Sequence, residues 1–192
     1  MLLGIAVDLA TKEVAFRYVA GVPVGVDRQE VLASGRNPGN LVPFHQPVVV
    51  IPKVLDFTLV LNPGAVFGIG AGKRWFFMIF TGGALIFGVL LFGAWTRPDE
   101  RLSHVALGLL LAGGLGNLYD RMFLACVRDF IHPLPDVHLP FGWAFPWGGT
   151  EVWPYVSNAA DLFLIIGILL LVYRSIRTGH RAEPASPARP PK

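Results

Sequence analysis

Long runs of apolar residues dominate the second half of the chain. Residues 75–95 contain no charged residue and are bounded by Trp75 and Trp95. A helix rises about 1.5 Å per residue, so this run is long enough to cross a hydrocarbon core of about 30 Å. Tryptophan at both ends is typical of the two membrane interfaces. The run therefore predicts a membrane-spanning helix.

Three further spans are predicted, over residues 1–20, 104–123 and 158–173. Residues 104–123 are rich in small residues, which allow helices to approach closely in lipid. The first span is the weakest, because Asp8 and Lys12 follow only a short apolar stretch. We expect either that it is short and partly interfacial or that its true start lies upstream of Met1. It has neither the basic leader nor the cleavage box of a removable signal peptide.

The segments outside the spans predict short strands, an aromatic loop and a tail. Residues 48–51 and 57–61 are rich in apolar and β-branched residues, which favours strands. Residues 131–155 combine Pro, Gly, Trp and Phe with few charges, a composition suited to a loop on the headgroup layer. Residues 174–192 are basic and Pro-rich, and we expect them to be disordered.

The composition supports a membrane protein and excludes other classes. Hydrophobic residues make up 53% of the 192 residues, charged residues only 15%, and the mean hydropathy is +0.54. We expect one membrane-embedded domain over residues 1–173. The net charge of +3 is small and gathers at the C-terminus, so no nucleic-acid partner is expected. The single cysteine, Cys126, and the scattered histidines predict neither a metal nor a cofactor.

Basic residues beside the predicted spans set the expected orientation. Arg97 and Arg101 lie in the link 96–103, and the tail 174–192 is rich in arginine. The excess of positive charge favours the cytoplasmic side for both segments. Residues 21–57 and 126–155 then lie on the outer side of the membrane.

Three acids are expected at one membrane edge. One span ends near Asp120 and the next begins near Asp161, so both ends must share a membrane face, and Asp129 lies between them. Ionisable residues at membrane depth are costly and usually functional. Two carboxylates that approach closely share one proton, as in aspartic peptidases. From the residues alone, such a dyad and the acid relay of a proton or ion transporter remain equally open.

Asparagine and arginine side chains accompany these acids. Asn117 precedes Asp120 by three positions, and Asn158 precedes Asp161 by three, so each pair shares a helix face. Asn158 could also cap its helix. Arg121 is expected to pair with a carboxylate, Asp120 being its neighbour, or to bind a substrate carbonyl.

Five boxes follow one another along the chain: Asp8-Leu-Ala-Thr11-Lys12, Asn62-Pro-Gly64-Ala65-Val-Phe67, Gly113-Gly114-Leu-Gly116-Asn117-Leu-Tyr-Asp120-Arg121, Val127-Arg-Asp129-Phe130 and Asn158-Ala-Ala160-Asp161. In order and in character they resemble those of the lipoprotein signal peptidases, or signal peptidase II. One such box is a weak signal, but five in order in a chain with four predicted spans are a strong one.

The resemblance implies roles for these residues. The implied catalytic dyad is Asp129 and Asp161. The residues implied to line the substrate groove are Asn62, Asn117, Arg121 and Asn158. The residues implied to support the site are Asp8, Lys12, Gly64 and Asp120. The implied substrate is a bacterial prolipoprotein whose lipobox cysteine carries a diacylglyceryl group. The implied cut falls just before that cysteine, at the outer face of the inner membrane, with the strands cradling the signal peptide.

The chain departs from the family pattern at several positions. Leu9 replaces a glutamine, Pro63 a threonine, and Ser157 a phenylalanine, and the stretch between the two dyad acids is longer than usual. Arg128 replaces a valine and could change the charge around Asp129.

The resulting expectation is a mainly α, polytopic membrane protein with four transmembrane helices and a small extracytoplasmic β-sheet. We expect a monomeric aspartic endopeptidase of the inner membrane that contacts lipid and acts on diacylglyceryl-prolipoprotein. Two rivals are a transporter that relays protons or ions through its acids and an inactive scaffold that binds lipoproteins.

Overall fold

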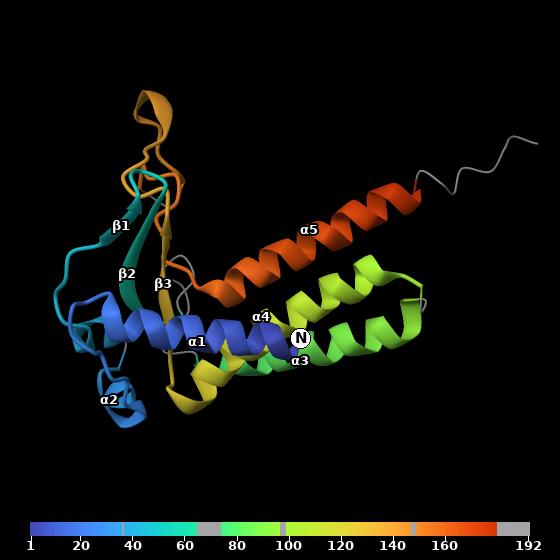
Figure 1. Ribbon diagram of the computed structural model, residues 1–192, viewed down its shortest axis with the longest axis horizontal. Coiled ribbons are helices and arrows are strands. Elements are labelled where there is room, and N and C mark those ends of the chain that lie inside the picture. The colour runs from blue at the N-terminus through green and yellow to red at the C-terminus, as the bar shows by residue number, and fades with distance from the viewer. Residues whose placement is uncertain (36, 65–73, 97–98, 147–148, 180–192) are drawn as a thin grey trace, which may run out of the picture.

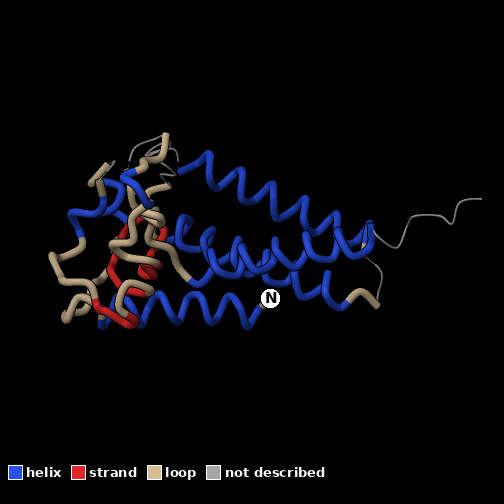
Figure 2. Tube along the Cα trace, turned by 90° about the horizontal axis from the view of Figure 1, so that it is seen from above, coloured by secondary structure: helices blue, strands red, loops and turns tan. Residues whose placement is uncertain are grey.

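The computed structural model describes residues 1–35, 37–64, 74–96, 99–146 and 149–179. Four long helices lie beside one another, and a small sheet stands across their ends (Figure 1). The long helices are α1 (Leu2–Tyr18), α3 (Arg74–Trp95), α4 (Arg101–Phe123) and α5 (Ala159–Gly179). The tube in Figure 2 shows the strands gathered at one end of the helical layer.

Three of these helices are long and apolar enough to cross a membrane, over Trp75–Ala94, Arg101–Phe123 and Ala159–Arg177. They match three of the predicted spans. The first predicted span forms α1, which has 17 residues and a length of about 25 Å, and packs against α4 and α5. The predicted class, a polytopic and mainly helical protein with a small sheet, is confirmed.

The last helix is longer than predicted. We expected the span to end at residue 173 and a disordered tail to follow, but α5 continues to Gly179. The first part of the expected tail is therefore helical. Arg174 pairs there with Glu100, just before α4, which ties the two helix ends together. The rest of the tail lies outside the described residues.

The sheet has three antiparallel strands in the order β1 (Val48–Ile51), β2 (Leu55–Asn62) and β3 (Val127–Pro133). The first two strands were predicted from the sequence, and the third, β3, was not. In β3 an arginine and an aspartate, Arg128 and Asp129, interrupt the apolar pattern. In the register of β2 and β3, Val60 lies opposite Asp129 and Asn62 opposite Val127.

A buried core joins the sheet to the outer end of α1. It contains Ala15 and Phe16 of the helix, Leu59 and Leu61 of β2, and Phe130 of β3. Successive side chains of a strand point to opposite faces, so Phe130 faces this core while Asp129 faces away from it. The smaller elements α2 (Arg28–Ala33), η1 (Pro38–Leu41) and η2 (Pro140–Gly142) lie in the connections.

Glycines bring the helices into close contact beneath the sheet. A Cβ atom at Gly113 of α4 would overlap the backbone carbonyl of Ala160 on α5. A Cβ atom at Gly116 would overlap the carboxylate of Asp8 on α1. These two glycines therefore allow α1, α4 and α5 to pack closely against one another.

Candidate active site

Asp129 is held on β3 by two amide side chains. Its side chain is buried, with a residue exposure of 2%. Its Oδ1 accepts a hydrogen bond from Nδ2 of Asn158 at 2.6 Å, and its Oδ2 accepts one from Nδ2 of Asn62 at 3.1 Å. Asn62 comes from β2 and Asn158 from the start of α5, so the sheet and the helical bundle both position this acid.

Asp161 lies in the first turn of α5 and is partly exposed. Its Oδ2 accepts a hydrogen bond from the backbone N–H of Asn158 at 3.2 Å, while Asn158 Oδ1 accepts one from the N–H of Asp161 at 3.2 Å. This reciprocal pair has the form of a capping box. It satisfies backbone donors at the helix start and fixes the Asp161 carboxylate there.

A chain of asparagines links the two acids. The Nδ2 of Asn158 donates to Asp129 and also to Oδ1 of Asn117, the latter at 3.1 Å. The Nδ2 of Asn117 donates to Oδ1 of Asp161 at 2.8 Å. Lys12 also donates to Asn117 Oδ1, at 3.0 Å, so this oxygen faces the cation and the amide nitrogen faces Asp161. The structure thus brings together two acids from distant parts of the chain.

The two acids differ in their surroundings. Burial, with a smaller contribution from the nearby charge of Asp161, raises the pKa of Asp129 from its ordinary value to about 7. The hydrogen bonds from Asn158 and Asn62 act in the opposite direction and are too weak to reverse the shift. Asp129 is therefore the acid suited to carry a proton near neutral pH, while Asp161 is the more exposed of the two.

Arg121 of α4 lines a cavity together with Asp161. Its sequence neighbour Asp120 pairs with Lys12 and Arg128 instead. The Arg121 guanidinium lies 5.7 Å from the ring centroid of Phe77 and donates to the backbone carbonyl of Asn117 at 3.3 Å. Its Nε is buried, and no hydrogen-bond partner for it occurs among the described residues. Arg121 therefore has a donor to spare for a bound molecule.

Arg121, Asn117 and Asp161 line a cavity of 330 Å³. The remaining walls are mostly apolar and come from α3, α4 and α5: Phe76, Phe77, Phe80, Thr81, Gly114 and Leu164. The cavity combines one acid, one cation and one amide with a largely apolar lining. It suits a peptide segment of low polarity whose backbone carbonyls need donors.

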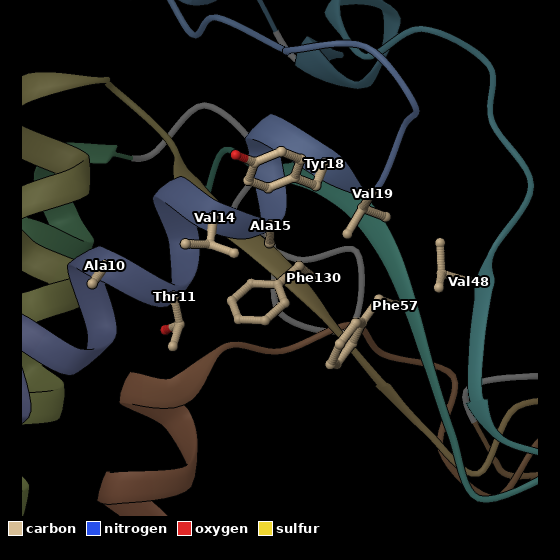
Figure 3. A pocket seen from close by; sticks show the side chains of 9 residues that line it. All are labelled: Ala10, Thr11, Val14, Ala15, Tyr18, Val19, Val48, Phe57 and Phe130. Carbon is tan, nitrogen blue, oxygen red and sulfur yellow. The ribbon is translucent and has the colours of Figure 1, made fainter.

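A larger cavity of 470 Å³ lies between α1 and the sheet, and Figure 3 shows it from close by. Apart from the hydroxyls of Thr11 and Tyr18, its walls are apolar, and the Thr11 hydroxyl donates to the carbonyls of its own helix. Phe130 of β3 lines it, so it lies on the opposite face of that strand from Asp129. No acid lines this cavity, and we assign the chemistry to the smaller one.

A buried ionic network supports the site from below. Lys12 Nζ lies 2.8 Å from Asp8 Oδ2 and 3.3 Å from Asp120 Oδ2, and all three side chains are fully buried. The other oxygen of Asp8 accepts the backbone N–H of Ala160 at 2.9 Å. The network therefore connects α1 with α4 and with the start of α5, which carries Asp161.

Two possibilities raised by the sequence are not realised in this network. Asp120 does not pair with its neighbour Arg121 but with Lys12 and with Arg128, whose Nη2 lies 3.1 Å from Asp120 Oδ1. The other possibility was that Arg128 changes the charge around Asp129. Because the two are adjacent on a strand, their side chains point to opposite faces, and Arg128 binds Asp120 and Glu13 instead.

Gly64 orients Asn62. Its backbone N–H donates to Oδ1 of Asn62 at 2.9 Å, which leaves the Nδ2 of Asn62 directed at Asp129. Gly64 has a φ of +98°, which favours glycine, and a Cβ atom there would lie 2.7 Å from the Phe77 ring. The rest of this box, including Ala65 and Phe67, lies outside the described residues.

Sequence analysis missed three contributors. Nothing in the sequence indicates that Glu13 pairs with Arg128. Nothing indicates either that the backbone N–H of Ala160 binds Asp8, apart from the position of Ala160 in the last of the five boxes. Phe77 lies within an apolar run in which every aromatic residue appears equivalent, so only the packing of α3 against α4 distinguishes it.

Comparisons with known proteins agree with this geometry. A model of the family described as signal peptidase (SPase) II matches residues 1–177. A lipoprotein signal peptidase of Ectopseudomonas mendocina (strain ymp) is 37% identical over 149 residues, covering 74% of this chain and 78% of the relative. One of Desulfitobacterium hafniense (strain DSM 10664 / DCB-2) is 33% identical over 135 residues, covering 70% and 76%.

Two solved structures of bacterial membrane enzymes have a similar fold. The first has a TM-score of 0.64 and 26% identity and covers 96% of this chain and 90% of its own. The second has a TM-score of 0.60 and 28% identity, with coverage of 91% and 88%. The matched family model spans nearly all of the described residues and includes every residue of the two-acid site, and this chain belongs to the signal peptidase II family.

Proposed function

We propose that the chain is an aspartic endopeptidase that removes signal peptides from diacylglyceryl-modified prolipoproteins and cuts just before the lipidated cysteine. The observation that carries the proposal is the pair Asp129 and Asp161, held in different environments and joined by Asn158 and Asn117. Family membership supports the prolipoprotein substrate. The lipid requirement and the position of the cut are inferred from the resemblance.

The two acids have complementary roles in this mechanism. Asp161, ionised, accepts a proton from a water molecule, whose oxygen attacks the carbonyl carbon of the scissile bond. Asp129, protonated, gives its proton to the carbonyl oxygen. When the resulting diol collapses, Asp161 returns its proton to the leaving nitrogen and Asp129 recovers one from the diol hydroxyl. No cofactor is needed, because the protons circulate between the two carboxylates.

The cavity residues would position the substrate. The spare donor of Arg121 suits a backbone carbonyl of the signal peptide, and the apolar walls from α3, α4 and α5 suit its small lipobox side chains. The site is at the ends of the membrane helices, which does not favour a transporter, whose acids would lie at several depths.

A gel-shift assay tests the proposed function. The purified chain, mixed with a diacylglyceryl-prolipoprotein, should convert it to a faster-migrating product. The same pro-protein without the diacylglyceryl group is the control and should remain uncut. If the lipidated substrate also remains uncut by folded protein, the chain is an inactive scaffold.

The pH dependence of cleavage should follow Asp129. Its pKa of about 7 lies above the ordinary value, so cleavage should fall as the pH rises through about 7 and the proton is lost. The contribution of Asp129 to the free energy of unfolding should also fall as the pH rises. A carboxyl whose pKa is higher in the folded state stabilises the fold below its unfolded pKa of 3.8, and this contribution is lost as the pH rises through about 7. Initial rates and unfolding midpoints between pH 5 and pH 9 measure both; rates that stay constant across pH 7 would remove Asp129 as the proton donor.

We also propose that the active site lies at the outer face of the bacterial inner membrane, with the C-terminus in the cytoplasm. The basic residues near Arg101 and in the tail support this orientation. Reporter fusions at Lys192 and at Phe141 should report opposite sides of the membrane. The same side for both would contradict the arrangement of the spans.

A further inference from the structure

The connection between Asp129 and Asp161 forms an arm with an exposed aromatic tip. We define the arm as residues 134–156, of which residues 147–148 are outside the described part. Its two ends are closed by an isolated bridge between Ile131 and Ser157, whose backbone groups exchange two hydrogen bonds of 2.8 Å. In Figure 1 the arm rises from the sheet and stands clear of the helices.

The arm has an ordered backbone. Val152 N–H donates to the carbonyl of Val137 at 2.7 Å, and Leu139 N–H to that of Thr150, also at 2.7 Å. His138 Nδ1 lies 2.8 Å from the hydroxyl of Thr150. These contacts form a hairpin ladder, so the side chains at the tip are presented in a defined direction.

The tip presents apolar rings to its surroundings. Phe141 is 91% exposed and Trp143 is 65% exposed, and their ring centroids are 6.1 Å apart. Phe141 has a φ of +61°, a conformation that a bulky residue rarely adopts. Residues 139–149 contain no charged residue. The protein therefore strains its backbone at Phe141 to present an uncharged aromatic pair that no described residue covers.

The position of the arm indicates what covers it. The strands run across the helix axes at the helix ends, and the arm continues sideways from β3, beyond the bundle. Along the helix axes it extends no farther than the outer end of α1 (Figure 1). A segment that leaves a membrane bundle sideways at the level of its helix ends lies over lipid rather than over the protein.

We propose that the tip of this arm, Phe141 and Trp143, inserts into the headgroup layer of the surrounding bilayer and anchors the connection between the two acids. Aromatic rings favour this layer, where an apolar body and a polar edge are both accommodated. Since the tip is uncharged, the anchor needs no anionic lipid. The inference uses the membrane placement of the helices and does not depend on peptidase activity.

Spin-label depth measurements test the anchor in full-length protein reconstituted in phosphatidylcholine nanodiscs. A Phe141→Cys variant carries the label. Burial raises the pKa of the native Cys126 to about 12, so this thiol stays protonated and should not react. An Asp99→Cys variant, in the exposed polar turn between α3 and α4, is the water-exposed control, and unsubstituted protein reports background labelling.

The label at Phe141 should collide more often with oxygen, which partitions into lipid, than with a water-soluble nickel complex. The label at Asp99 should show the reverse preference. A Phe141 label that prefers the nickel complex would place the tip in water. A label shielded from both reagents would place it under protein, for example a second copy of the chain. Either result would overturn the proposal, whether or not the chain cleaves prolipoproteins.

Discussion

The Asp129→Asn variant is expected to fold normally and to lose cleavage. Asparagine keeps the shape of the side chain but cannot hold and release the proton that the mechanism requires. General acid–base catalysis contributes about 10²- to 10⁴-fold to a rate, so turnover should fall by at least about 10²-fold. The amide keeps one of the two hydrogen bonds that Asp129 accepts and, like the protonated acid, is uncharged. We therefore expect the free energy of unfolding to stay within about 1 kcal/mol of the wild-type value.

Initial rates on lipidated prolipoprotein and thermal unfolding in detergent measure both effects. Asp136→Asn is a matched control, because it neutralises an exposed acid on the arm. It should change the stability by less than about 0.5 kcal/mol and leave the rate unchanged. Near-normal turnover by folded Asp129→Asn protein would remove this residue from the mechanism.

The Asp120→Asn variant should show the opposite pattern, with lower stability and retained cleavage by the protein that folds. Asp120 is fully buried between Lys12 and Arg128. Breaking a buried ion pair costs about 3–5 kcal/mol. Lys12 keeps Asp8 and Arg128 keeps Glu13 as partners, so a loss near the lower end, about 3 kcal/mol, is expected.

Comparing the two variants distinguishes a residue that stabilises the fold from one that takes part in catalysis. Unfolding curves give the stability, and rates normalised to the folded fraction give the activity. If Asp120→Asn proves stable and inactive while Asp129→Asn remains active, the dyad is instead Asp120 with Asp161. The assignment of Asp129 from the Val-x-Asp-Phe box would then be wrong.

The helical part of the fold could be predicted because membrane spans depend on length and apolarity, which the sequence shows directly. The run 75–95 became α3 with nearly the same ends. The predicted span ends at residue 173, but α5 continues to Gly179, and Arg174 within it pairs with Glu100.

The sheet was predicted only in part, for a physical reason. Val48–Ile51 and the middle of β2 have the apolar, β-branched composition of strands. Residues Val127–Pro133 do not, because their polar side chains are paired with residues far away in the sequence. Arg128 reaches Asp120 and Glu13 on one face, and Asp129 reaches Asn62 and Asn158 on the other. Such tertiary pairing is not visible in local sequence.

The sequence indicated which residues form the candidate site, but not which of them bind one another. Spacing placed Asn158 and Asp161 on one helix turn, and the capping box agrees with it. The pairing of Asp120 with Lys12 joins two different helices, and no local pattern distinguishes it from a pairing with Arg121. The orientation of the Asn117 amide likewise depends on Lys12, 105 positions away.

The most direct test of the central claim is the mass of the products that the wild type and the Asp161→Asn variant form from one diacylglyceryl-prolipoprotein. The account predicts that the wild type releases the intact signal peptide and a protein whose first residue is the lipid-bearing cysteine. It predicts that folded Asp161→Asn protein leaves the substrate whole. A cut at another bond, or the same two products from Asp161→Asn, would contradict the proposal that Asp129 and Asp161 together cleave the bond before the lipidated cysteine.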